Sequence, residues 1–175
     1  MKKATMDRSK IGQQRVGAPV MAAFDALVDA VDRQKWPDFQ REPIGYYFSR
    51  MIAVWLPWLM DHALSDEQLN AVSSVDVTAL TLLLFRDMFR HNCRLLRPDS
   101  QNADWVEELF YELASELGVS KAKLHDDGQP YDLEDIGNCE WARSLALPFG
   151  LPAEKLFACH SSIVAGARDE YGGSA

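Results

Sequence analysis

The sequence predicts an all-α protein, folded as a single-domain bundle of about six or seven helices behind a flexible basic N-terminal arm. Along most of the chain, apolar residues recur at spacings of three and four, which is the period of an amphipathic helix. Prolines and glycines separate these periodic segments. No segment between turn signals alternates apolar and polar residues in the way a half-buried strand does. We therefore expect helices throughout.

Length and charge set the domain organisation. A chain of 175 residues with 47% hydrophobic residues is large enough to fold as one domain without a metal or disulfide. The formal net charge is -8, yet the first 20 residues contain five basic side chains and one acidic one. We expect residues 1–17 to be a flexible basic arm and residues 18–175 to be the helical domain. The acidic balance argues against a general binder of nucleic acids or anionic membranes.

The first half of the helical domain contains three expected helices. The first covers residues 18–35 and ends before Pro37, because the residue preceding a proline is disfavoured in a helix. The second covers residues 43–62, and its apolar run is too short to span a bilayer. Ser65 and Gln68 have the spacing of a capping box, which predicts the start of a short third helix.

The second half of the domain contains the longest expected helix, over residues 75–97. Its beginning is apolar nearly all round, which predicts a central, buried position. The next helix is expected to begin after Asn102 and to end at Gly118, where glycine allows a left-handed turn. A short helix is expected after Ser120. The last two helices are expected over residues 133–147 and 152–167.

Two rows of opposite charge are predicted on neighbouring helices. Four arginines share one face of the longest helix, and four carboxylates follow at steps of four on the next. In one interpretation the rows neutralise each other along the hairpin, each exposed pair contributing ~0 to 1 kcal/mol. In the other, the arginines bind an acidic partner or phosphate, and the carboxylates imitate a nucleic acid towards a basic protein. The rows are Arg86, Arg90, Arg94 and Arg97, and Asp104, Glu108, Glu112 and Glu116.

A twelve-residue pattern occurs twice, over residues 113–124 and 145–156. Both copies read Leu-Ala-x-x-apolar-Gly-apolar-x-x-x-Lys-Leu. The first copy resembles the turn of bacterial helix-turn-helix regulators, and this resemblance implies a DNA-reading helix. Residues 99–140, however, hold 12 acidic side chains and two lysines, which favours a structural corner because such a field repels phosphate. The residues that the resemblance implies for DNA contact are Ser120, Lys121 and Lys123.

Catalytic and metal-binding motifs are absent from the sequence. It contains no Gly-x-Ser-x-Gly, no phosphate-binding glycine loop and no His-Glu-x-x-His. Three cysteines without a Cys-x-x-Cys pair are typical of reduced thiols, and no zinc-ligand spacing is present. We expect a cytoplasmic, non-enzymatic regulator, inhibitor or accessory factor without a cofactor, metal or membrane contact. It would act by binding another macromolecule, and a protein is the favoured partner. The alternative is a helix-turn-helix transcriptional regulator.

Overall fold

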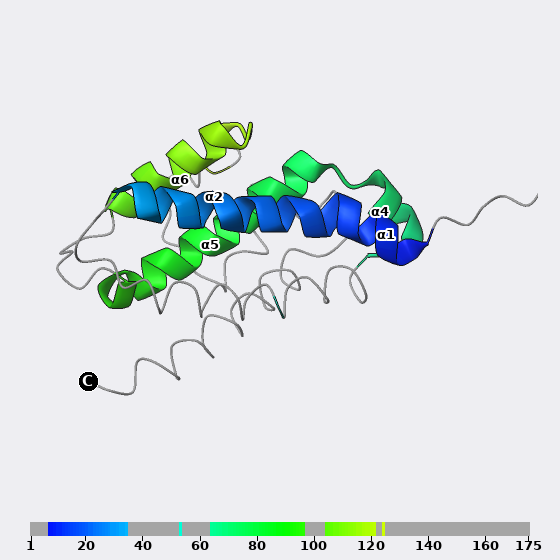
Figure 1. Cartoon of the computed structure of the whole chain (residues 1–175), viewed down its shortest axis with the longest axis horizontal. Helices are drawn as coiled ribbons and strands as arrows, with labels where there is room; N and C mark the ends of the chain where they lie inside the picture. Colours follow the sequence, from blue (N-terminus) through cyan, green and yellow to red (C-terminus); the bar gives the residue numbers. More distant parts are fainter. Residues whose placement is uncertain (1–6, 35–52, 54–63, 97–103, 122–123, 125–175) are drawn as a thin grey trace, which may run out of the picture.

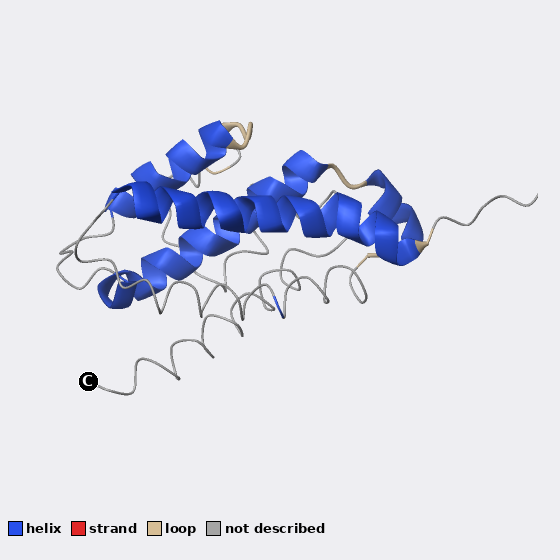
Figure 2. Cartoon of the chain, viewed as in Figure 1, coloured by secondary structure: helices blue, strands red, loops and turns tan. Residues whose placement is uncertain are grey.

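The computed structural model describes residues 7–34, 53, 64–96, 104–121 and 124. These residues form helices and turns, with no strand among them, so the all-α prediction is confirmed for this part of the chain (Figure 2). The predicted total of six or seven helices concerns the whole chain and is not tested. Apart from Ala53, which is helical, the segments expected as helices over residues 43–62, 133–147 and 152–167 lie outside the described residues.

Two long helices form the centre of the described structure. Helix α2 (Ala18–Gln34) and helix α5 (Ser74–Leu96) pack against each other, and their bounds agree with the predicted helices to within a residue (Figure 1). The apolar first half of α5 is buried, as the sequence predicts, from Val77 to Phe85. The two helices meet through the apolar faces that their residue spacing creates.

Helix α6 (Asp104–Glu116) packs on both α5 and α2. The contact between α5 and α6 contains an aromatic cluster around Phe89. Its ring lies edge-to-face with Trp105 at 5.8 Å and with Phe110 at 5.5 Å between ring centroids. Such geometry is favourable because the positive edge of one ring meets the negative face of the other. The short connection predicted between these helices therefore joins two elements that do pack together.

The end of α6 forms the predicted corner. Gly118 has a φ of 70°, a left-handed conformation that glycine adopts without the steric cost of a side chain. The Val119 amide donates to the Ala114 carbonyl at 2.8 Å, and the Gly118 amide donates to the Ser115 carbonyl at 3.4 Å. These two bonds make a Schellman motif. Val119 is buried behind the turn.

Helix α4 (Asp66–Ala71) begins with the predicted capping box. The Ser65 hydroxyl accepts the Gln68 amide at 3.2 Å, and the Gln68 side-chain oxygen accepts the Ser65 amide at 2.8 Å. Both bonds satisfy amides that have no partner within the helix. A local sequence rule was sufficient here because donor and acceptor lie three residues apart.

The last ten residues of the expected flexible arm are helical in the structure. Helix α1 (Arg8–Gly12) and the π-helix η1 (Gln13–Gly17) continue directly into α2, and α1 packs against α4 (Figure 1). Ile11 and Val16 are buried, and Arg8 forms an ion pair with Asp66. Ile11 and Val16 are five residues apart, a spacing that fits the wider turn of a π-helix. The α-helical pattern uses spacings of three and four and therefore does not include this pair. Residues 1–6 lie outside the described residues.

Candidate functional site

The predicted arginine row begins inside the protein. Only 2% of the Arg86 side chain is exposed; it donates a hydrogen bond to the Leu124 carbonyl and lies 3.5 Å from a Glu107 oxygen. Arg90, one turn further along α5, forms an ion pair with the other oxygen of Glu107. A side chain as buried as Arg86 does not reach a partner at the surface, so the predicted binding row is corrected at this position.

The sequence pattern contained a sign of this burial. Arg86 follows Leu82 by four residues and precedes Phe89 by three, and both of these apolar side chains are buried on α5. Glu107 precedes buried Phe110 by three residues on α6. Residues at these spacings share one side of a helix. Arg86 and Arg90 both contact Glu107, a carboxylate of α6 that the predicted row does not contain.

The remaining members of the arginine row lie partly or wholly outside the described residues. Arg94 lies on α5, but its side chain is outside the described residues, as is the whole of Arg97. In the carboxylate row, Asp104, Glu108 and Glu112 are exposed on α6. The fourth member, Glu116, pairs with a residue of α2, as described next.

Glu116 and Arg33 connect the C-terminal turns of α6 and α2. The Nη2 of Arg33 donates a hydrogen bond to the Oε1 of Glu116 at 2.7 Å. The Arg33 side chain is 60% exposed and the Glu116 side chain is 43% exposed. The partner predicted for Glu116 is an arginine of α5. The observed partner, Arg33, lies on α2, 83 residues earlier in the sequence. An ion pair this exposed contributes ~0 to 1 kcal/mol.

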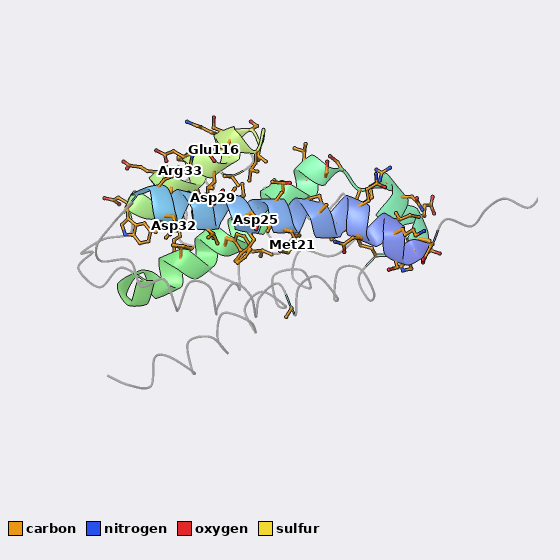
Figure 3. All side chains as sticks on the ribbon, in the orientation of Figure 1. Met21, Asp25, Asp29, Asp32, Arg33 and Glu116 are labelled. Carbon is orange, nitrogen blue, oxygen red and sulfur yellow. The ribbon has the colours of Figure 1, made fainter. Side chains whose placement is uncertain are left out.

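An open groove of about 720 Å³ lies beside this ion pair, and we call it the α2–α6 groove. Carboxylates from two helices surround it, small alanines of α2 form part of its wall, and Arg33 supplies the positive charge among its lining residues (Figure 3). Its lining consists of Ala22, Asp25, Ala26, Asp29, Asp32, Arg33 and Glu116.

The three aspartates of the groove follow from the sequence of α2. Asp25, Asp29 and Asp32 are spaced by four and three residues, which places them on one side of the helix. Asp25 and Asp29 have no ion-pair partner among the described residues. The amphipathic pattern of α2 could have revealed this acidic side, but the proximity of Glu116 depends on how α6 packs. The arrangement can hold positively charged groups, because clustered carboxylates concentrate a negative field in a groove.

The helix-turn-helix-like segment has the geometry of a corner. Ser120 and Lys121 are exposed after the turn, and Lys123 lies outside the described residues. The Lys121 ammonium lies 5.6 Å from the centroid of the Tyr111 ring, over α6. Leu124 is buried, and its carbonyl accepts the hydrogen bond from Arg86. These contacts anchor the corner to the body of the protein.

Within the described residues, no three histidine, cysteine, aspartate or glutamate side chains come together as a metal site would require. None of the described helices combines the length and the apolar character needed to cross a membrane.

Comparison with known proteins identifies no relative: no protein family, curated protein or solved structure matches the chain. The class that the described residues define is therefore a helical protein with an acidic groove between α2 and α6. Its function has to be argued from that groove.

Proposed function

We propose that this protein is a non-enzymatic regulatory, inhibitory or accessory factor that binds another protein through an acidic surface. The surface consists of the α2–α6 groove and the exposed carboxylates of α6. The observation that carries the proposal is the groove itself, where four carboxylates and a single guanidinium from two helices line one open space. Lysine and arginine side chains of a partner are the groups that such a field attracts.

The chemistry of the surface favours a protein over a nucleic acid as the partner. Phosphates carry the same sign of charge as the groove and are repelled by it. Carboxylates repeated along α6, among them Glu108 and Glu112, also resemble the charged backbone of a nucleic acid. The proposed partner surface is therefore basic, of the kind that binds DNA or RNA in other proteins.

Charge reversal tests this proposal. The protein is immobilised and exposed to a native-host extract treated with nuclease, and retained proteins are compared between the wild type and Glu108→Lys with Glu112→Lys. We expect a partner retained by the wild type to be lost from the double variant, because opposite charges become like charges. Glu67→Lys on α4 is a control for charge reversal at an exposed position, since Glu67 is also exposed but lies on another helix.

Two results would contradict the proposal. One is a partner that the double variant retains as well as the wild type does. The other is binding of duplex DNA that weakens steeply with salt and is lost in Lys121→Glu, because this would support the helix-turn-helix alternative.

A further inference from the structure

Two arginines of the N-terminal segment contact opposite ends of α4. Arg8 on α1 donates hydrogen bonds to the Asp66 carboxylate and to the Leu64 carbonyl, both at the beginning of α4. Arg15 on η1 donates to the Val72 carbonyl, directly after the last residue of α4, at 3.4 Å. Both arginines belong to the segment expected as a flexible basic arm. In the structure they fasten that segment to α4 of the same chain.

Helices α1 and α4 are too short to be stable alone. Helix α1 has five residues and α4 has six, whereas isolated helices of fewer than about 12 residues are marginal in water. The two helices pack against each other at one end of α2 (Figure 1). Ile11 of α1 and Leu69 of α4 are both buried. Each helix therefore depends on contacts with other elements for its stability.

The π-helix η1 marks a boundary between α1 and α2. It packs against α2 and α5, whereas α1 packs against α4. The change from α-helical to π-helical hydrogen bonding thus coincides with a change of packing partner. Folded proteins open locally in contiguous cooperative units, which often coincide with small groups of packed elements. The pair of α1 and α4 has the composition of such a unit.

We infer that α1 and α4 open and close together, as a unit separate from the centre formed by α2 and α5, and that Arg8 and Arg15 hold this unit closed. The inference goes beyond the proposed function and does not depend on it. In the closed state both arginines are bound to α4. Opening releases their charges to solvent and turns the N-terminal segment into a basic arm.

The first test compares hydrogen exchange of single backbone amides in the full chain by NMR. We expect the protection factors of Gln13, whose amide bonds to the Lys10 carbonyl of α1, and of Leu69 on α4 to be similar. Both should be at least about tenfold lower than that of Leu83, which is buried in the middle of α5. Low concentrations of urea should accelerate exchange of Gln13 and Leu69 equally.

The second test weakens α4 without touching α1. Ser65→Ala removes the capping hydrogen bond to the Gln68 amide, which lies wholly within the start of α4. We expect the protection factor of Gln13 to fall about two- to tenfold, by the same factor as that of Leu69, because the loss of a cap raises the population of the shared open state. Ser73→Ala is the matched control, since Ser73 accepts an amide at the start of α5 instead, and it should leave Gln13 unchanged.

The third test weakens the contact between the helices. Arg8→Gln should lower the protection factors of Leu69 and Val72 on the α4 side about two- to tenfold, because their helix loses a hydrogen-bonding partner. Lys10→Gln removes an exposed positive charge from the same helix α1 and should change them less than about twofold. Circular dichroism shows whether each variant is folded.

Three outcomes would overturn the inference. One is a Gln13 protection factor that Ser65→Ala leaves unchanged, because α1 and α4 would then open independently. Another is protection of Gln13 and Leu69 equal to that of Leu83, because the only opening would then be that of the whole molecule. The last is a Lys10→Gln effect as large as that of Arg8→Gln, since the change would then reflect net charge alone.

Discussion

Arg86 is a charged residue whose surroundings make it part of the core. Its guanidinium connects three segments: α5, on which it lies, Glu107 of α6, and the Leu124 carbonyl beyond the corner. Taking a charge out of water is unfavourable unless it is paired and hydrogen-bonded. The position therefore serves the fold, because the guanidinium lies inside the protein.

We expect Arg86→Met to lower the free energy of unfolding by about 1 to 3 kcal/mol, because the buried Leu124 carbonyl loses its donor. Methionine keeps the unbranched apolar length of the side chain, so the loss reports mainly on the polar contacts. Urea unfolding followed by circular dichroism measures it. Arg90→Met is the control, since Arg90 is 26% exposed and its loss should cost less. Equal losses at the two positions would contradict a special role for Arg86.

At the scale of elements, α1 and η1 extend the helical body towards the N-terminus. Val16 is fully buried, Ile11 is 6% exposed, and Arg15 donates to the Val72 carbonyl at 3.4 Å. The segment therefore contributes apolar contacts to the same core as α2 and α5. A freely moving arm would contribute none.

This difference can be measured with Val16→Ala. We expect the free energy of unfolding to fall by about 1 to 3 kcal/mol, because two buried methyl groups are lost and a cavity remains. Gln14→Ala, at an exposed position of the same π-helix, should change it by less than about 0.5 kcal/mol. Urea unfolding of both variants decides the matter: if Val16→Ala were as neutral as Gln14→Ala, the segment would not be part of the core.

At the scale of the whole molecule, charge is distributed unevenly between surface and interior. Arg86 and Arg90 of α5 both contact Glu107, whereas the acidic α2–α6 groove is open to solvent. The negative charge available to a partner thus lies on α2 and α6 and not along the α5–α6 hairpin alone. A contact between these exposed carboxylates and a basic partner is sensitive to ionic strength, because salt screens exposed charges.

We expect partner binding to weaken as salt is raised from 0.1 M to 1 M, over which the Debye length falls from about 10 Å to about 3 Å. Titration of the retained partner against the full chain at both salt concentrations measures the change. Asp25→Asn with Asp29→Asn should reduce the salt dependence, since fewer charges then take part. Affinity that is indifferent to salt would point to an apolar interface instead.

The sequence by itself determined the features that depend on neighbouring residues. These are the helical class, the bounds of α2 and α5, the Ser65 capping box and the Gly118 turn. Each follows from contacts within a few residues along the chain, where periodicity and capping chemistry are sufficient.

Tertiary structure decided the features that depend on packing between helices. It buried Arg86, paired Glu116 with Arg33 from α2, and added the residues before Ala18 to the core. The spacing of Asp25, Asp29 and Asp32 was readable in the sequence, but the groove that they line together with Glu116 was not. The reason is physical: a helical pattern fixes which residues share a side, while the partner of that side is chosen by the packing of elements far apart in the chain.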